Sequence, residues 1–471
     1  MLLVGLALWA VVGPLAQVPE DGFDAVFTPG TIRVDYRHTG GPGGEAVVLD
    51  RVAQDGEWPG PRTHLVDDSG FGHYRVEVKN LTDGRLVYAR GFSSIYAEWD
   101  TTPEAKTTRR TFHESVRFPR PRGPVTVTLL RRLAGAFQPL WSTRVDPAAR
   151  AVQPAPAPVG TVWTLFEHGP PATMVDLLIL GEGYTAAERQ KFHADVARLV
   201  EAMFQVEPYR SRRHNFNVRA IDLPSPVSGV SRPQDGVAKR TAFGTSYDIF
   251  GTDRYMLAQD NRALRDVASA VPYDAVEVLV NERTYGGGGI YGAHATVAAD
   301  NPYAAYVFTH EFAHHFAGLG DEYYSSEVAY ATGGAVHDEP WEPNITALAD
   351  PALLKWRDLV APGTPLPTPW NREAYEAAGP SFLRRRATLR EQKADDAALD
   401  ALSREQEAWQ TAFLAALPHA GQVGAFEGAS YEARGLFRPS PDCIMFSRAQ
   451  REFCAVCRRA ITRAIDALSH P

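Results

Sequence analysis

The sequence predicts a multi-domain protein in which an all-β antiparallel sandwich precedes a C-terminal α/β (α+β) domain. Short segments of alternating apolar and polar residues fill residues 23–147, a Pro/Ala-rich stretch occupies 148–160, and strand-like and helix-like segments alternate over 161–471. Alternation with a period of two is typical of half-buried strands, whereas alternating strands and helices are typical of α/β domains. A chain of 471 residues is long enough for this division.

The first domain is predicted from five segments separated by Gly, Pro and Asp turns. These segments are TIRVDYRHTG, EAVVLDRVA, HYRVEVKN, RLVYARGFSSIYAEW and VTVTLLRR. Its histidines, His38, His73 and His113, are scattered, so we interpret them as surface or hydrogen-bonded residues and expect no active site here. The Pro/Ala stretch that follows is expected to be an extended, semi-rigid linker.

The second domain opens with a predicted buried strand, Met174 to Tyr184, which runs into a glycine turn. Thr185 and Glu188 have the spacing of a capping box, which predicts that a helix begins there. FNVRAIDLPS and DAVEVLVNE are further predicted strands. A charged, alanine-rich segment at about 371–418 has helical spacing and is expected to form one or two surface helices.

Composition and the N-terminus bound the function. The hydrophobic content of 44%, the net charge of -8 and the lack of a basic cluster indicate a globular protein without a nucleic-acid partner. Residues 1–16 are apolar and end in Pro-Leu-Ala, which predicts a cleaved signal peptide, although the segment lacks Lys and Arg. A membrane tether and a misassigned start are the alternatives. No other stretch is apolar enough to span a bilayer, so we expect an exported chain at an extracellular, periplasmic or cell-surface location; its oligomeric state is left open.

The most informative segment is THEFAHHFAGLGDEYY, residues 309–324. On a helix, His310 and His314 are one turn apart on one face, so both imidazoles can reach one ion at about 2 Å. Glu311 can then direct its carboxylate at a water on that ion. The apolar residues of AAYVF and those around the motif predict a buried helix, and Gly318 is a natural stop.

A catalytic zinc ion needs a third protein ligand and an open position for water. The metzincin pattern HExxHxxGxxH places its third ligand three residues after the glycine, and Asp321 stands at that interval after Gly318, although this sequence has one extra residue before the glycine. Asp321 is therefore the first choice and Glu322 the alternative. His315 is disfavoured because it lies about 100° around the helix from His314.

A glycine-rich segment, YGGGGIYGAHATVAA, precedes the metal-binding motif. The four glycines predict a flexible bend, and the alternating residues after them predict an exposed edge strand to which an extended peptide can add. Whether Tyr291 or His294 touches a substrate is left open, and Tyr323 and Tyr324 are assigned no role.

The three cysteines, Cys443, Cys454 and Cys457, lie within fifteen residues of one another. In an exported chain such clustering favours one disulfide with one thiol left over. A structural zinc site is the alternative, but the sequence does not reveal a fourth ligand.

The chain resembles the M64 peptidases, the family named after a bacterial immunoglobulin A protease. FDAVFTPGTIRVDYRHTG, GFSSIYAEWDTT and SVRFPRP resemble the family's N-terminal domain, whereas VDLLILGEGYT, FNVRAIDLPSPVSG, the HExxH block and VGAFEGASYEARGLFRPSPDCIM resemble its catalytic domain. The resemblance implies a metzincin-like zinc metalloprotease domain with one catalytic Zn²⁺. It also implies that Met445, in DCIMF, forms a methionine turn beneath the metal ligands. The segment at about 371–418 departs from the family and is expected to be a helical insertion.

The reaction expected from these residues is hydrolysis of a peptide bond. Zinc lowers the pKa of a bound water toward about 7, and Glu311 takes the proton and passes it to the leaving amine. The expected function is that of a zinc-dependent endopeptidase acting on extracellular protein substrates. A metal-dependent amidase acting on cell-wall or small amide substrates and a non-catalytic binding protein are the alternatives.

Overall fold

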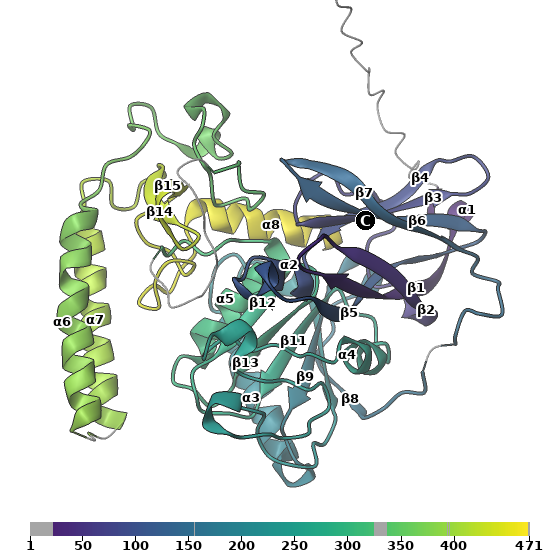
Figure 1. Ribbon diagram of the computed structural model, residues 1–471, viewed down its shortest axis with the longest axis horizontal. Coiled ribbons are helices and arrows are strands. Elements are labelled where there is room, and N and C mark those ends of the chain that lie inside the picture. The colour runs from purple at the N-terminus through teal and green to yellow at the C-terminus, as the bar shows by residue number, and fades with distance from the viewer. Residues whose placement is uncertain (1–21, 155, 325–336, 393, 395, 470–471) are drawn as a thin grey trace, which may run out of the picture.

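The computed structural model describes residues 22–469 except 155, 325–336, 393 and 395. The expected signal peptide at residues 1–16 lies outside the described residues. The N-terminal part is β-rich and the C-terminal part mixes helices and strands, as the sequence predicts (Figure 1). Within the described part of the chain, no helix is both long and apolar enough to cross a membrane.

Two antiparallel sheets form the N-terminal part. The first has the order β2-β1-β5 and the second the order β4-β3-β6-β7. Their strands are β1 (Phe27–Gly40), β2 (Ala46–Glu57), β3 (Tyr74–Asn80), β4 (Leu86–Phe92), β5 (Arg110–Pro121), β6 (Val125–Leu133) and β7 (Ala136–Val145). Residues from both sheets share one apolar core, which includes Ile32, Val78 and Val127, so the two sheets pack as a sandwich.

Two short helices accompany the sandwich, α1 (Phe23–Val26) and α2 (Ile95–Asp100). Residues of α2 were expected to continue a strand. A helix forms instead because Ser94 has extended backbone and its side chain accepts a hydrogen bond from the Ala97 amide, an N-cap. Tyr96 and Trp99 are buried in a satellite core.

A six-stranded sheet with the order β12-β13-β11-β9-β10-β8 forms the centre of the C-terminal part. Its strands are β8 (Thr161–Phe166), β9 (Val175–Glu182), β10 (Phe216–Asp222), β11 (Ala275–Val280), β12 (Gly287–Ile290) and β13 (His294–Ala298). The four inner strands run parallel, while β8 and β12 pair antiparallel at the two edges. β9, β10 and β11 are buried along their whole length, as the continuous apolar run in the predicted first strand indicated.

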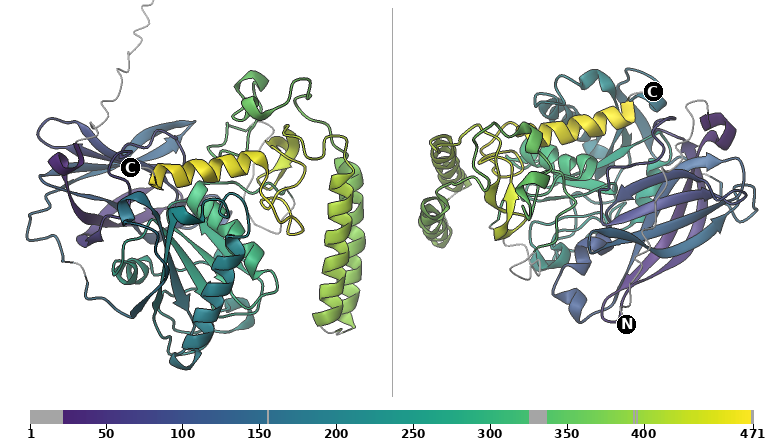
Figure 2. Two further views of the ribbon diagram at one scale, coloured as in Figure 1. Left: turned by 180° about the vertical axis from the view of Figure 1, so that it is seen from behind. Right: turned by 90° about the horizontal axis from the view of Figure 1, so that it is seen from above.

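Helices cover both faces of this sheet (Figure 2). α3 (Arg189–Met203), α5 (Ala304–Ala317) and α8 (Ala455–Ser469) share one core with it, and α4 (Asn261–Ala268) packs on the other face. The capping box predicted before α3 is confirmed, since the Thr185 amide donates to Glu188 Oε2 at 2.9 Å and the reciprocal bond is present. The chain then enters α3 through a 3-10 turn, Ala186–Glu188.

The glycine-rich segment differs from the prediction. The glycines form the edge strand β12 itself, and the residues expected at the edge form β13, which is buried one position further in. A Cβ on Gly289 would lie 2.3 Å from the Glu311 carbonyl oxygen, and one on Gly287 would lie 2.6 Å from Val307 Cγ1. Since both contacts are to α5, the glycines allow this helix to pack directly on the edge strand.

The segment expected to be an insertion forms the hairpin α6 (Arg372–Glu391) and α7 (Asp396–Ala415), which projects to one side of the molecule in both Figure 1 and Figure 2. A second hairpin, β14 (Phe426–Ala429) and β15 (Glu432–Arg438), follows it. The first part of the expected linker packs on the sandwich, because the Gln153 amide donates to the Val52 carbonyl at 2.9 Å.

The two parts of the chain are joined by buried charge. Arg33, which is fully buried in β1, lies 3.1 Å from Asp35 and 3.3 Å from Asp55, and it also pairs with Asp266 of α4. The Arg117 guanidinium lies 3.6 Å from the ring centroid of Tyr273. Asp35 and Asp55 belong to the sandwich itself, so the contacts of Arg33 with Asp266 and of Arg117 with Tyr273 are those that hold the sandwich against the α/β part.

Candidate metal centre and cleft

α5 presents the HExxH residues. Its apolar side packs into the core through buried residues that include Phe312, Ala313 and Phe316, which leaves His310 and His314 on the side that faces the following loop. The helix ends where predicted, because Gly318 has φ +64°, a left-handed conformation that glycine adopts without a Cβ penalty. The chain can therefore turn back toward the helix and bring Asp321 to the histidines.

Three donor atoms converge at this point. The two Nε2 atoms of His310 and His314 are 3.1 Å apart, and Asp321 Oδ1 lies 3.1 Å from the first and 3.2 Å from the second. A tetrahedral ion about 2.0–2.1 Å from each donor requires donors about 3.3 Å apart, so the three atoms are already close to the spacing that zinc needs.

The outer nitrogen of each ring faces a backbone carbonyl. His310 Nδ1 lies 3.1 Å from the Ile444 carbonyl oxygen, and His314 Nδ1 is hydrogen-bonded to that of Leu319. Since a carbonyl only accepts, each Nδ1 carries the proton and donates it. In the neutral form of each ring, Nε2 on the side of Asp321 is then the unprotonated nitrogen, which is the tautomer of a metal ligand.

This arrangement calls for a positive charge between the donors. Asp321 Oδ1 is buried and lies against the Nε2 atoms of His310 and His314. In the metal-free protein a proton supplies the charge: although burial opposes it, Asp321 raises the pKa of His314 to about 9. A divalent cation would displace that proton, which is the expected coupling between metal binding and proton release.

Asp321 and Glu322, the two candidates for the third ligand, point in different directions. Asp321 faces the histidines, and its Oδ2 accepts a hydrogen bond from the Tyr431 hydroxyl. Glu322, the alternative ligand, is fully buried and its Oε1 accepts from Asn344 Nδ2 at 3.0 Å and from Cys457 Sγ at 3.0 Å. Of the two acids, only Asp321 joins the histidine cluster.

Glu311 lines a cavity of about 320 Å³ together with His314 and Asp321. Burial, reinforced by the charge of Asp321, raises the pKa of the Glu311 carboxyl, although the two histidines act in the opposite direction. A carboxylate whose pKa lies above its usual range is a better proton acceptor.

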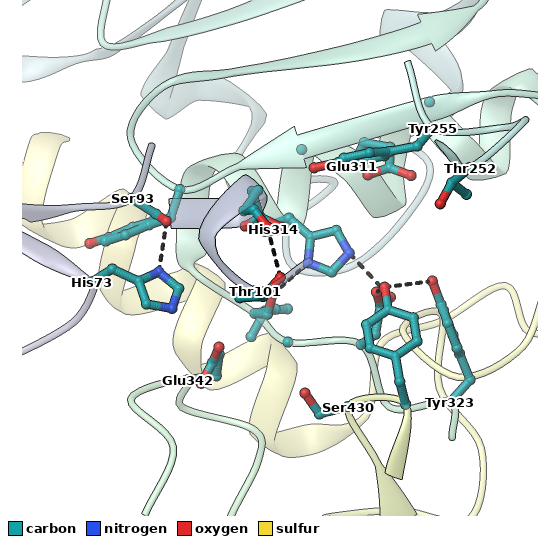
Figure 3. Close-up of a pocket in the computed structure, with 18 of the residues that line it drawn as sticks. His73, Ser93, Thr101, Thr252, Tyr255, Glu311, His314, Tyr323, Glu342 and Ser430 are labelled. Carbon is teal, nitrogen blue, oxygen red and sulfur yellow. Dashed lines mark hydrogen bonds and ion pairs between the residues drawn. The ribbon is translucent and has the colours of Figure 1, made fainter. Parts of the chain in front are cut away.

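The sandwich forms one wall of this cavity, where no functional residue was expected. His73, Ser93, Glu98 and Thr101 all line it (Figure 3). His73 Nδ1 is 2.8 Å from the Ser93 hydroxyl, and its Nε2 accepts from Trp341 Nε1 at 3.4 Å, which ties the wall to the α/β part. Burial lowers the pKa of His73 to about 4, so the ring is neutral at pH 7.

Met445 is fully buried in the core shared by α5 and α8, at the centre of a turn in which the Phe446 and Ser447 amides both donate to the Cys443 carbonyl. The backbone of this turn reaches both sides of the metal centre. The Met445 carbonyl accepts from the Glu322 amide at 2.8 Å, and its neighbour Ile444 accepts from His310.

Other residues weighed from the sequence lie in distinct places. His315 is buried between α5 and the sheet, where its Nδ1 is 3.0 Å from the Ile290 carbonyl oxygen. Tyr291 and Tyr323 line the cavity, whereas His294 and Tyr324 are buried and are not among its lining residues. Sequence reasoning missed Tyr431, because 110 residues separate it from Asp321 and its surrounding sequence has no metal-site pattern.

The three cysteines are free thiols in the structure, where the sequence favoured a disulfide. They converge on Glu322, and the four side chains form a second cluster of metal-ligating type. The fourth member was not evident in the sequence because it follows Asp321 directly and lies 135 residues from Cys457.

A helix that presents HExxH, followed by an acid that closes on both histidines beside a cavity, is an arrangement typical of metal-dependent peptidases. Comparison with protein families agrees: the model described as IgA Peptidase M64 matches residues 163–465, and that described as Peptidase M64 N-terminus matches residues 22–140. The chain therefore belongs to the IgA Peptidase M64 family, which confirms the resemblance, and it is a peptidase by that membership. No curated protein matches it.

Proposed function

We propose that this protein is a zinc-dependent endopeptidase with a metzincin-like catalytic domain, in which His310, His314 and Asp321 hold one catalytic zinc ion and Glu311 is the general base and acid. The observation that carries the proposal is the convergence of three donor atoms, 3.1–3.2 Å apart, beside a cavity lined by Glu311. Two imidazoles and one carboxylate are a donor set suited to zinc.

Bound zinc would supply a Lewis acid that polarises the scissile carbonyl and acidifies a water. The protein's residues perform the remaining tasks. Glu311 accepts the proton of the attacking water and delivers it to the leaving amine. The carbonyls of Ile444 and Leu319 fix the tautomers of His310 and His314, while Tyr431 holds the carboxylate of Asp321 in place.

The edge strand supports an extended peptide as the substrate. Gly287 and Gly289 line the cavity, so a stretch of backbone without side chains borders the space beside Glu311. Gly287 is already paired on this edge, because its amide donates to the Arg254 carbonyl and its carbonyl accepts from the Met256 amide. An extended peptide would therefore form its main-chain hydrogen bonds further along the strand, at Gly289. The opposite wall, from the sandwich, would then contact substrate side chains.

Export is part of the proposal and rests on the apolar segment at residues 1–16, which has the features of a signal peptide. The substrates would then be extracellular proteins.

Glu311→Gln tests the proposal, because the amide keeps the shape of the side chain but accepts no proton. Purified wild type and variant would be assayed for zinc content and for cleavage of a proteome-derived peptide library. We expect equal zinc content and a loss of peptide cleavage by a factor of about 10²–10⁴. Equal cleavage by both proteins would reject Glu311 as the base, and cleavage confined to small amides would favour an amidase.

A further inference from the structure

A second cluster of metal-ligating side chains lies behind the catalytic centre. Its members come from three separate segments: Glu322 from the loop after α5, Cys443 from the turn that contains Met445, and Cys454 and Cys457, of which the first immediately precedes α8 and the second lies in its first turn. One ligand atom from each of the four lies within 4.8 Å of all the others. Three sulfurs and an oxygen around a tetrahedral zinc ion would be about 3.5–3.8 Å apart, so little movement is needed to fit one.

The contacts within the cluster resemble those around a metal-bound thiolate. Cys457 Sγ is 3.0 Å from Glu322 Oε1, and Cys454 Sγ is 3.9 Å from the same oxygen. Backbone amides are directed at sulfur: that of Cys454 at Cys443 Sγ at 3.2 Å, and that of Cys457 at Cys454 Sγ at 3.4 Å. Amide donors near the start of a helix stabilise negative charge on sulfur.

Burial makes an unbalanced charge costly at this position. Glu322, Cys443 and Cys457 are fully buried. Glu322 Oε2 has no hydrogen-bond partner among the described residues, and although Arg438 acts electrostatically on this carboxylate, its guanidinium donates to the carbonyls of Gly428 and Glu427. A buried carboxylate beside three thiols is unfavourable unless a cation or additional hydrogen bonds compensate it.

We propose that Cys443, Cys454, Cys457 and Glu322 bind a second zinc ion, which is structural. Thiolate ligands favour zinc over magnesium or calcium, and four protein ligands close the coordination shell, as in structural sites. A disulfide between any two of the cysteines would leave the third thiol unused and would supply no cation to Glu322, whose Oε2 has no hydrogen-bond partner among the described residues. This site shares no ligand with the catalytic site.

The second ion would support the catalytic centre from behind. Glu322 directly follows Asp321, and its amide donates to the Met445 carbonyl at 2.8 Å. Cys443 directly precedes Ile444, whose carbonyl accepts from His310. An ion that ties Glu322 to Cys443 therefore fixes both the segment that presents Asp321 and the carbonyl that orients His310, and it anchors both to α8.

Zinc coordination in the full-length wild-type protein tests this proposal without any variant. X-ray absorption at the zinc edge is expected to show sulfur scatterers at about 2.3 Å together with nitrogen and oxygen scatterers at about 2.0 Å. Elemental analysis should give about two zinc ions per chain, one for each site. Nitrogen and oxygen scatterers alone would overturn the proposal.

A variant separates the two sites. In His310→Ala/His314→Ala, we expect about one zinc ion per chain, with predominantly sulfur scattering, because the cysteine cluster is untouched. Loss of all zinc from this variant while it keeps the wild-type circular dichroism spectrum would overturn the proposal. If instead the catalytic proposal fails, the wild type itself would show one sulfur-ligated ion.

Counting the free thiols tests whether two of the three cysteines form a disulfide instead. Wild-type protein unfolded in chelator without reductant should expose all three cysteines to alkylation, since zinc holds them as thiolates. Alkylation of only one cysteine before reduction would show a disulfide and reject the site. Cobalt substitution gives a further spectroscopic check, because a thiolate-bound Co²⁺ ion absorbs strongly in the near ultraviolet and one bound only by nitrogen and oxygen does not.

Discussion

Removal of the hydrogen bond from Tyr431 to Asp321 perturbs the proposed metal centre without substituting any of its ligands. Tyr431→Phe removes one hydroxyl and keeps the ring. Tyr431 has φ +65°, and because Phe has the same backbone preferences, the substitution adds no strain at this position. The lost group donates to Oδ2 of a carboxylate that is 8% exposed, so water can replace it only in part.

The expected magnitude follows from the charge of the acceptor. A hydrogen bond to a charged group contributes about 1.5–3 kcal/mol, which corresponds to about 10- to 150-fold in affinity. Loss of an outer-shell partner of a metal ligand costs about 10- to 100-fold in metal affinity. We therefore expect Tyr431→Phe to weaken binding of the catalytic zinc ion by about 10- to 100-fold.

The assay is competition for zinc between the protein and a chromophoric chelator, with circular dichroism to confirm folding. Tyr323→Phe is the matched control, because the Tyr323 hydroxyl lies 3.3 Å from that of Tyr431, whereas the hydrogen bond to Asp321 Oδ2 comes from Tyr431. An unchanged zinc affinity in Tyr431→Phe would refute the reasoning. An equal loss in Tyr323→Phe would show that the effect does not pass through the bond to Asp321.

Three further predictions concern the ligand, the edge strand and the sandwich. Asp321→Asn should lower the zinc affinity of the catalytic site by more than the factor of about 10 to 100 expected when an outer-shell partner is lost, as measured by the same competition. A zinc affinity equal to that of the wild type would exclude Asp321 as a ligand. Gly289→Ala should destabilise the protein by about 1–3 kcal/mol in urea unfolding, because its Cβ would lie 2.3 Å from the Glu311 carbonyl oxygen, whereas Gly123→Ala, with open space around it, should change stability by less than about 0.5 kcal/mol. Although burial opposes it, the pairing of His38 with Glu114 and Glu45 raises its pKa to about 9, so up to about 3 kcal/mol of stability is present below about pH 6.5 and is lost as the pH rises through 9. His38→Gln should flatten this alkaline decline in urea unfolding and His64→Gln should not; a decline of equal size in His38→Gln would contradict the assignment.

Local patterns predicted the elements whose determinants are close together in sequence. Helical spacing and the stop at Gly318 fixed α5, and the Thr185–Glu188 pair marked the entry to α3. The continuous apolar run before it predicted a strand buried on both faces, and β9 is such a strand. Each of these depends on contacts within one or two turns of chain, which a sequence displays directly.

The glycines of β12 were misjudged because their determinant is tertiary. Consecutive glycines are typical of a bend, but here the packed helix α5 excludes any side chain from the strand beneath it. α2 was missed for a different reason, because its determinant is local: the N-cap at Ser94 prevails over the β-propensity of the aromatic residues around it.

The sequence predicted those residues of the candidate site that lie close together along the chain. His310, Glu311, His314 and Asp321 lie within twelve residues, and the structure brings the two histidines and Asp321 together. Partners that orient them come from far along the chain: the Ile444 carbonyl, Tyr431 and the sandwich residues His73 and Ser93. Nothing in local sequence marks a backbone carbonyl as an acceptor for a distant histidine, so such partners emerge only from the fold.

Zinc-dependent peptide cleavage tests the central claim most directly. Protein would be stripped of metal by a chelator, its refolded state checked by circular dichroism, and its cleavage of a peptide library followed as zinc is returned. The account predicts no cleavage without metal and full recovery once the site of His310, His314 and Asp321 is filled, with no recovery in Glu311→Gln at the same zinc content. Cleavage at the wild-type rate by folded, metal-free protein would contradict it.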